Sequence, residues 1–323
     1  FSYFSSRLSE DKNSFYLLII VPAAWVCIEF LRSHILSGFG WNLIGYSQFK
    51  ELSLIQVADI CGVYGVSFLV IFSNYILWLI ISKLKNISQM TIKRQILILF
   101  LILVIIVGLV AGYGRQRLNQ NFINFDRPLR ISVIQPNIPQ DLKWDPEARE
   151  YIFGRLINLT LTASTDEPDM IIWPESAVPV YFKENSLDLD RIFQLVKQLK
   201  IHLLTGVIIY ENDKFYNSAV LISPQGKVVA RYDKLHLVPF GEFIPLRKIL
   251  PFLSAVVGIG DFTPGKVYKL FELSKSEGHK FSVLICFEDA FSYLGRQFRN
   301  KGASLLVNIT NDAWFGKTSA PYQ

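Results

Sequence analysis

One cysteine in this sequence stands where a strand is expected to end, and two carboxylates follow it. The apolar, β-prone run Phe281 to Ile285 leads into Cys286, and Glu288 and Asp289 come just after. Such a run predicts a buried strand that presents Cys286 at its end, where a rigid sheet can hold a reactive group. A free cysteine is also commonly a small buried hydrophobic residue, so this segment alone leaves both interpretations open.

A glutamate and a lysine follow two other predicted strands. Met170 to Trp173 is apolar, and Pro174, which cannot donate to a sheet, should end that strand and leave Glu175 at its end. Lys234 follows a predicted β-hairpin that spans residues 219–231 and turns at a Pro-Gln-Gly segment. Three chemically useful side chains are therefore predicted just past the ends of strands.

These three side-chain types can do chemistry together. A thiol is mostly protonated at neutral pH, and a nearby carboxylate such as Glu175 can accept its proton. The ammonium group of Lys234 can stabilise the oxyanion of a tetrahedral intermediate. The combination predicts acyl transfer through a thioester on Cys286.

Longer motifs surround these positions. They are WPES at 173–176, YDKLHLVPFGEF at 232–243, ICFED at 285–289, NITNDAWFG at 308–316, IQPNIPQDLKW at 134–144 and GFGWNLIGYSQ at 38–48. In this order they resemble the nitrilase, or carbon–nitrogen hydrolase, superfamily and, within it, the apolipoprotein N-acyltransferase family. The resemblance covers most of the chain. It implies an α+β fold in which transmembrane helices precede a nitrilase-like αββα sandwich.

The resemblance also implies roles for individual residues. Glu175 would be the general base, Lys234 the oxyanion stabiliser and Cys286 the nucleophile. Glu242, Glu288 and Asn311 match positions that support the site. Trp144 matches an aromatic position near the acyl pocket, and Phe287 is assigned to the substrate-binding residues. A purely structural, salt-bridging role for the two supporting glutamates stays open. Phe287 stands where we expect tyrosine from the family pattern, so the role of that hydroxyl does not carry over.

The reaction implied by the resemblance is ping-pong and needs no cofactor. The thiol of Cys286 would take an acyl chain from the sn-1 ester of a phospholipid, phosphatidylethanolamine by resemblance. The α-amine of a diacylglyceryl lipoprotein would then accept it. The four histidines lack metal-ligand spacing. Two alternatives stay open: a membrane-tethered amidase that uses water as its second nucleophile, and a non-catalytic membrane receptor, against which the intact Glu-Lys-Cys set argues.

The elements that position these residues can be predicted from periodicity. Strands are expected at 131–135, 170–173, 202–209, 219–223, 227–231, 281–286 and 304–309, and helices at 146–164, 186–199 and 291–300. Asp145 is expected to cap the helix that starts at Pro146. This alternation agrees with the sandwich that the resemblance implies.

The composition indicates a membrane part joined to a globular part. Of 323 residues 51% are hydrophobic, and the mean hydropathy is +0.30. Apolar stretches at about 14–31, 63–81 and 96–113 are each long enough to span a bilayer core of roughly 30 Å as a helix. We expect a transmembrane region at 1–117 and an exocytoplasmic catalytic domain at 118–323. We also expect truncation at both ends, because the chain starts without methionine and the family pattern continues past residue 323.

Loop charge predicts the orientation of the spans. The linker between the second and third spans carries the bases Lys83, Lys85, Lys93 and Arg94, so it should face the cytoplasm. The catalytic domain would then lie on the periplasmic side of a bacterial inner membrane, as part of a multi-pass monomer. The net charge of +6 needs no nucleic-acid partner to explain it. In that oxidising compartment an unpaired Cys286 indicates a reactive thiol.

Two segments outside the predicted spans have both a lipid-binding and a structural interpretation. The loop between the first two spans, which includes Tyr46, is rich in glycine and aromatic residues. It is either an interfacial aromatic belt or a lipid entrance, where Arg32 and His34 could meet a phospholipid headgroup. The apolar segment 243–265 either packs on the core or forms a mobile lid that admits acyl chains.

Overall fold

The computed structural model describes residues 15–35, 38–84, 87–120, 128–182, 187–244, 262–273, 280–316 and 318. The chain separates into two compact units, one formed by residues 1–125 with 322–323 and one by residues 126–321. We call them the helical unit and the α/β unit and describe each by itself. Most of the segment predicted as a lid, residues 245–261, lies outside the described residues.

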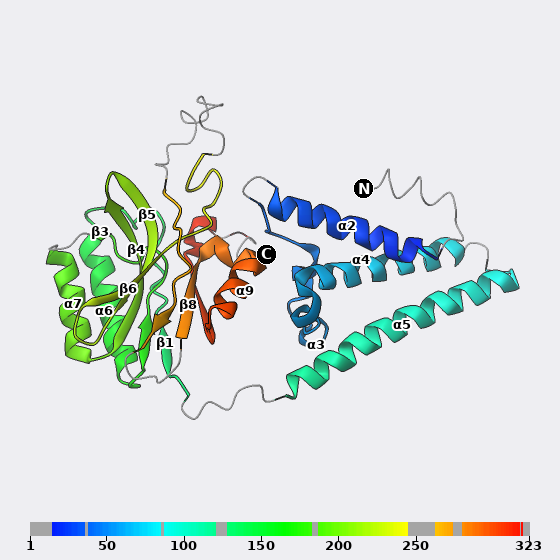
Figure 1. Ribbon diagram of the computed structural model, residues 1–323, viewed down its shortest axis with the longest axis horizontal. Coiled ribbons are helices and arrows are strands. Elements are labelled where there is room, and N and C mark those ends of the chain that lie inside the picture. The colour runs from blue at the N-terminus through cyan, green and yellow to red at the C-terminus, as the bar shows by residue number, and fades with distance from the viewer. Residues whose placement is uncertain are drawn as a thin grey trace. The chain divides into compact units, whose positions relative to one another are not determined.

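The helical unit is built on three long apolar helices, drawn blue to cyan in Figure 1: α2 (Leu17–His34), α4 (Ala58–Leu84) and α5 (Met90–Leu118). Each is long and apolar enough to cross a membrane. The three stretches predicted as spans each overlap one of these helices, which confirms the prediction of three apolar helices. Side chains such as Leu18, Ile76 and Leu99 pack between them, while much of their outer apolar surface stays exposed, as expected for contact with lipid.

A short connection joins α2 to α4. It contains the 3-10 turn η1 (Ile44–Gln48) and the single helical turn α3 (Leu52–Ile55). Gly45 lets η1 approach α4 closely, because a Cβ atom there would lie only 2.7 Å from the carbonyl oxygen of Val63. The connection is therefore held against the helices rather than extended away from them.

The α/β unit contains two sheets. The larger sheet consists of β1 (Ile131–Val133), β2 (Met170–Ile172), β3 (Tyr181–Phe182), β4 (His202–Glu211), β5 (Lys214–Ile222) and β6 (Val228–Asp233). Its order is β1-β2-β4-β5-β6, with β3 beside β4; β1, β2, β3 and β4 pair in parallel, and β4, β5 and β6 are antiparallel. The smaller sheet has the order β7 (Phe271–Glu272), β8 (Lys280–Ile285), β9 (Leu305–Ile309).

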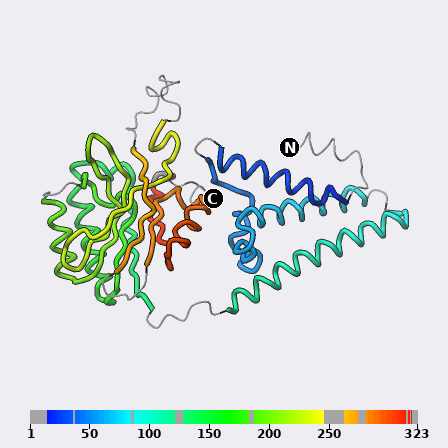
Figure 2. Tube along the Cα trace, viewed as in Figure 1, coloured from blue at the N-terminus to red at the C-terminus, as the bar shows by residue number. Residues whose placement is uncertain are grey.

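Helices cover the outer faces of both sheets. In Figures 1 and 2 the helices α6 (Arg149–Ser164) and α7 (Leu187–Leu199) lie on one side of the larger sheet, and α9 (Ser292–Asn300) lies on the far side of the smaller one. The buried core under α6 and α7 includes Phe153 and Trp173, and the Trp173 indole donates a hydrogen bond to the Thr160 hydroxyl at 2.9 Å. The predicted αββα sandwich is confirmed.

Two local expectations differ from the structure. The helix α6 begins at Arg149 after Ala148, so the prediction that Asp145 caps it is wrong. The Asp145 carboxylate instead accepts a hydrogen bond from the backbone N–H of Glu147 at 2.9 Å, which stabilises a turn before the helix. The strands β3 and β7 were not predicted, because two residues each are too few to show an alternating pattern.

Candidate active site

Glu175 lies just past β2, buried at the end of the parallel part of the larger sheet. Its carboxylate accepts two hydrogen bonds, one from the Asn217 side-chain amide at 2.7 Å and one from the backbone N–H of Asn311 at 3.1 Å. The next residue, Ser176, has a φ of +45°, so the chain turns sharply as soon as Glu175 has been presented. These contacts hold the carboxylate in one orientation.

A glycine on β4 makes room for this turn. A Cβ atom on Gly206 would lie 2.6 Å from the Cα atom of Glu175 and 2.6 Å from the carbonyl oxygen of Pro174. Because these neighbours are backbone atoms, a side chain at position 206 would displace Glu175 itself.

Lys234 follows β6 and is only 1% exposed. Its ammonium nitrogen lies 2.9 Å from one oxygen of Glu242 and 3.0 Å from the other, and 3.7 Å from Oε1 of Glu175. Burial by itself lowers the pKa of Lys234, but the neighbouring carboxylates raise it above the ordinary value. Lys234 therefore carries a positive charge between two negative ones.

Asn217 on β5 connects the two carboxylates. Its amide donates to Glu175 and to Glu242, with both distances 2.7 Å. Glu242 also accepts a hydrogen bond from the backbone N–H of Val238 at 2.8 Å, which fixes the loop after Lys234. The predicted residues Glu175, Lys234 and Glu242 are thus brought together in one hydrogen-bonded group.

Cys286 follows β8 at the turn into the 3-10 segment η2 (Cys286–Ala290). Its φ of +52° is in the left-handed region, which costs a non-glycine residue on the order of 1–3 kcal/mol. Burial and, to a lesser extent, the charge of Glu175 raise the pKa of the Cys286 thiol, whereas Lys234 and a hydrogen bond with Thr310 lower it; the net pKa is about 12. The thiol is therefore neutral at pH 7 and needs a base to become a nucleophile.

Glu288 is fully buried between the segments that carry Lys234 and Cys286. One of its oxygens accepts hydrogen bonds from the backbone N–H groups of Leu235 at 2.7 Å and His236 at 3.0 Å. The other accepts from the N–H of Ile285 at 2.8 Å, and the Tyr232 hydroxyl is 2.9 Å from both. Burial raises the pKa of Glu288, and these donors oppose that rise. Glu288 thus joins the loop after Lys234 to the strand before Cys286.

Lys143 is a residue of the site that our sequence reasoning missed. It is 8% exposed, and its ammonium group donates a hydrogen bond to the backbone carbonyl of Glu175 at 3.1 Å. Burial lowers the pKa of Lys143 to about 8, although the charges of Glu175 and Cys286 oppose this shift. The available signal was a lysine next to Trp144 inside a mostly uncharged motif.

Asn311 lies after β9 and contributes more than its N–H group. Its side-chain amide donates to the Gln140 side chain at 2.9 Å, so the loop that contains Lys143 is tied to the smaller sheet. Asn217 and Gln140 were not predicted either. Asn217 lies outside the motifs of the resemblance, and Gln140 lies in the motif at 134–144, from which only Trp144 was selected.

The two predicted substrate-side aromatic residues have different surroundings. Trp144 is 44% exposed and stacks on Tyr181 with ring centroids 6.3 Å apart; Tyr181 in turn contacts Phe215 at 5.5 Å. Phe287 is buried, and its ring packs against Phe291 at 5.1 Å. A substrate contact for either residue stays a prediction.

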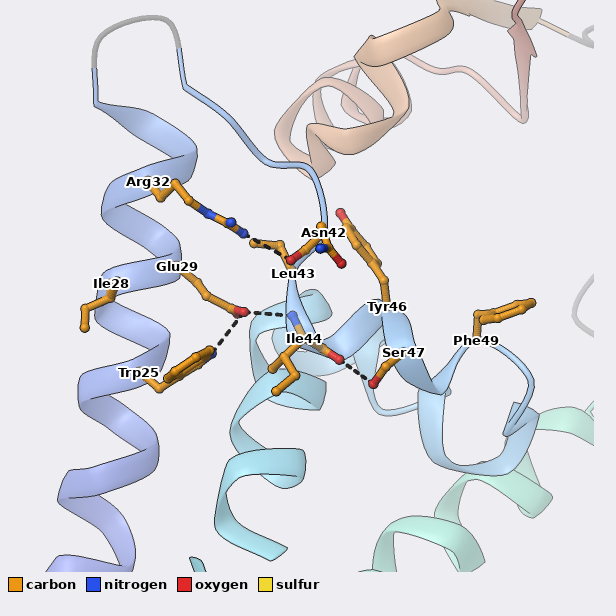
Figure 3. Close-up of a pocket in the computed structure, with 10 residues that line it drawn as sticks. All are labelled: Trp25, Ile28, Glu29, Arg32, Asn42, Leu43, Ile44, Tyr46, Ser47 and Phe49. Carbon is orange, nitrogen blue, oxygen red and sulfur yellow. Dashed lines mark hydrogen bonds between the residues drawn. The ribbon is translucent and has the colours of Figure 1, made fainter. Parts of the chain in front are cut away.

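Three further predicted residues belong to the helical unit. The Arg32 guanidinium donates to the backbone carbonyls of Trp41 at 3.0 Å and Asn42 at 3.2 Å. The His34 ring hydrogen-bonds the Phe30 carbonyl at 2.8 Å, one turn earlier on α2. Arg32 and Tyr46 line a pocket of this unit, drawn in Figure 3. Their contact with a lipid headgroup stays a prediction.

The arrangement in the α/β unit supports one kind of chemistry. A neutral thiol lies in the electrostatic field of a carboxylate that can accept its proton and of an ammonium group that can stabilise an oxyanion. The second ammonium, on Lys143, holds the backbone of the carboxylate residue. This set suits nucleophilic attack on an acyl carbon.

Comparison with known proteins gave matches to both units. The family described as carbon-nitrogen hydrolase matches residues 130–323, and the apolipoprotein N-acyltransferase N-terminal domain matches residues 1–76. The apolipoprotein N-acyltransferase of Geobacter metallireducens is 41% identical over 97% of this chain and 60% of the relative. That of Rickettsia typhi is 35% identical over 97% of this chain and 61% of the relative. The chain thus spans about three fifths of the length of these curated relatives.

Solved structures are similar at a much lower level, and one of them serves as an example. It is an amidase from Nesterenkonia sp., 19% identical, with a TM-score of 0.44 over 62% of this chain and 71% of the amidase. A likeness of this degree does not bear on the chemistry of the site.

Proposed function

The chain belongs to the carbon–nitrogen hydrolase family, and on that premise we propose that it transfers a fatty acyl chain from a phospholipid to a lipoprotein. The acceptor in this proposal is the N-terminal α-amine of a diacylglyceryl cysteine. The observation that carries the proposal is the joining, in one chain, of a Glu-Lys-Cys group with three helices able to cross a membrane. The names of the curated relatives support the same reaction.

The first half of the reaction begins with a neutral thiol. Glu175 accepts the proton of Cys286 as the sulfur attacks the ester carbonyl of the phospholipid, and the oxyanion that forms lies near the ammonium of Lys234. When the intermediate collapses, the ester C–O bond breaks and Glu175 returns the proton to the departing alkoxide. The products are a lysophospholipid and an acyl thioester on Cys286.

The second half reverses these roles. The α-amine of the acceptor attacks the thioester carbonyl, and Glu175 takes a proton from the attacking nitrogen. The C–S bond then breaks, and the proton returns to the sulfur, so that Cys286 is again a neutral thiol as its raised pKa requires. An amide has formed, a thioester has been consumed, and no cofactor is needed.

The membrane orientation in the proposal follows from charge. Lys83 lies at the end of α4, and Lys93 and Arg94 lie near the start of α5, so the connection between these helices favours the cytoplasmic side. The helix α5 then carries the chain across once, and the α/β unit lies on the periplasmic side of the inner membrane. A monomer is sufficient, because Glu175, Lys234 and Cys286 come from one chain.

The test is the mass of the intact protein after incubation with phosphatidylethanolamine in detergent, without acceptor. We expect an added acyl mass that hydroxylamine removes, that is absent from Cys286→Ala and that persists in Cys61→Ala, whose cysteine lies exposed in the helical unit. Addition of a diacylglyceryl-cysteine peptide should move the acyl group to the peptide amine. An unmodified mass in folded protein would overturn the proposal and favour an amidase.

A further inference from the structure

The mechanism proposed above leaves one polar side chain beside the nucleophile without a role, that of Thr310. The strands β8 and β9 are parallel neighbours in the smaller sheet, and their last registered pair is Ile285 with Ile309. Cys286 and Thr310 are the residues that directly follow this pair. The Thr310 hydroxyl hydrogen-bonds the Cys286 thiol. Thr310 therefore reaches the reacting sulfur from the neighbouring strand.

The same hydroxyl has a second acceptor. It donates a hydrogen bond to Oδ1 of Asp312, with the two oxygens 2.9 Å apart. Asp312 is exposed and begins the 3-10 turn η3 (Asp312–Phe315). A hydroxyl has a single proton, so it can donate fully to only one acceptor at a time. The sulfur of Cys286 and the carboxylate of Asp312 therefore compete for the proton of Thr310.

The charge of the sulfur decides this competition. The sulfur of a neutral thiol or of a thioester is a weak acceptor, so the hydroxyl then stays with the Asp312 carboxylate. A thiolate carries a full charge and forms a stronger hydrogen bond. In the proposed mechanism a thiolate is present only before the attack on the acyl carbon and after the C–S bond breaks, since the resting thiol of Cys286 is neutral.

The donors of Thr310 and Lys234 act on different atoms. The Lys234 ammonium lies 2.9 Å from Glu242 and is the donor proposed for the oxyanion. The hydroxyl of Thr310 contacts the sulfur itself. One donor therefore serves the oxygen of the tetrahedral intermediate, and the other serves the sulfur that enters and leaves it.

We propose that Thr310 is a catalytic residue whose hydroxyl donates to the sulfur of Cys286 whenever that sulfur is negatively charged, and that Asp312 is a positioning residue that holds the hydroxyl at other times. The hydroxyl keeps its own proton and only turns between two acceptors, and the proton of the thiol still goes to Glu175. This role deepens the proposed acyl transfer and rests on acylation of Cys286, but any acyl donor can reveal it.

The experiment uses p-nitrophenyl butyrate as the acyl donor for the full chain in detergent. The nitrophenolate release that is lost in Cys286→Ala measures acylation, and the intact mass then follows discharge of the butyryl thioester by hydroxylamine. Thr310→Val replaces the hydroxyl by a methyl group of similar size. We expect both rates to fall about tenfold, the order of one hydrogen bond to a charged atom. Thr310→Ser, which keeps the hydroxyl, should restore most of both rates.

Two controls separate this role from a structural one. In denaturant the thioester should be discharged at the same rate in the parent and in Thr310→Val, because no fold then places a donor at the sulfur. Thr162→Val removes an exposed hydroxyl that donates to the Asn158 carbonyl on α6, and it should change neither rate in the folded protein.

Asp312→Asn tests the competition for the hydroxyl, and since Asp312 is exposed this variant should fold even if Thr310→Val does not. Asparagine keeps an oxygen for Thr310 but removes the charge, so the hydroxyl is held less strongly. Discharge should become up to about fivefold faster, the difference between hydrogen bonds to a charged and to a neutral oxygen. In the Thr310→Val background this acceleration should disappear, because no hydroxyl is left to release.

The outcomes separate this inference from the proposed function. Unchanged discharge in folded Thr310→Val, or an Asp312→Asn variant as slow as Thr310→Val, would overturn the role of Thr310. A parent that reacts with the nitrophenyl ester but takes no chain from phosphatidylethanolamine would overturn the proposed acyl donor and leave the role of Thr310 standing. A folded parent without Cys286-dependent release would overturn both.

Discussion

Replacing Glu288 with glutamine tests whether one buried carboxylate holds the two sides of the candidate site together. The carboxylate accepts from Leu235 and His236 with one oxygen and from Ile285 with the other. In Glu288→Gln one oxygen becomes an NH₂ group that can only donate. If the remaining oxygen faces Leu235 and His236, the N–H of Ile285 loses its acceptor. In the reverse orientation the oxygen faces Ile285, and the N–H groups of both Leu235 and His236 lose theirs.

The first orientation is the less costly, and it sets the expected loss of stability. A buried donor without an acceptor costs about 1–3 kcal/mol, and hydrogen bonds to a neutral oxygen are each weaker by about 1 kcal/mol than those to a carboxylate. Removing a buried charge offsets part of this cost. We expect a loss of about 2–4 kcal/mol, which for a domain of this size lowers the melting temperature by about 6–12 °C.

Activity should fall as well, because Ile285 directly precedes Cys286. A displacement of about 1 Å between a nucleophile and its partner groups can lower a rate by about a hundredfold. The assays are scanning fluorimetry in detergent and the rate of acyl-enzyme formation. The matched control is Glu211→Gln, in which an exposed glutamate loses a surface ion pair with Arg231 that is worth at most about 1 kcal/mol.

Two results would refute this reasoning. A melting temperature for Glu288→Gln within about 2 °C of the parent would mean that the carboxylate contributes little beyond filling space. A variant that is destabilised as expected but forms the acyl-enzyme at the parental rate would separate stability from the placement of Cys286.

Two pH-dependent predictions concern the buried titratable groups. The thiolate absorbance of Cys286, identified by its loss in Cys286→Ala, should be absent at pH 7 and half developed near pH 12. The pKa of Cys286 in the folded protein lies above that of an unfolded thiol, which is about 8.5. The contribution of the neutral Cys286 thiol to folding stability should therefore be lost as the pH rises from about 8.5 towards 12. Half-development of thiolate below pH 9 would contradict this. The Lys143 ammonium should lose its proton near pH 8, so acyl-enzyme formation should decline above that pH, and Lys143→Met should be about 10–100-fold slower and lack this alkaline decline. An unchanged decline in Lys143→Met would assign it to another group. Because the folded pKa of Lys143 is lowered, its contribution to stability should rise with pH between about 8 and 10.4.

The backbone positions of the candidate catalytic residues could be predicted because each follows an apolar run. Glu175, Lys234 and Cys286 come just past β2, β6 and β8, as the change from apolar to polar residues indicates. The three apolar helices could be predicted from the length of their apolar runs, and the strands and helices of the α/β unit from their periodicity, whereas the αββα arrangement was implied by the resemblance. The resemblance of the motifs then placed these residues in one site.

The network around these residues could not be predicted, because it depends on sheet register and on contacts far apart in the sequence. Asn217 reaches Glu175 only because β5 pairs with β4 in one particular register. Lys143 reaches the same residue from a loop with no periodic pattern. The misassigned cap at Asp145 has a local cause, since an aspartate can stabilise a turn or a helix start and the sequence favours both.

The division of the site between two sheets has a consequence for folding kinetics. Glu175 and Lys234 follow strands of the larger sheet, whereas Cys286 and Asn311 follow strands of the smaller one. The hydrogen bond from Asn311 to Glu175 spans 136 positions of the chain. Contacts between residues so far apart in the sequence form late, because the long loop between them must close before they are made. The candidate site is therefore completed at the last stage of folding. In chains that have formed only one sheet, the thiol of Cys286 and the carboxylate of Glu175 are not yet close together.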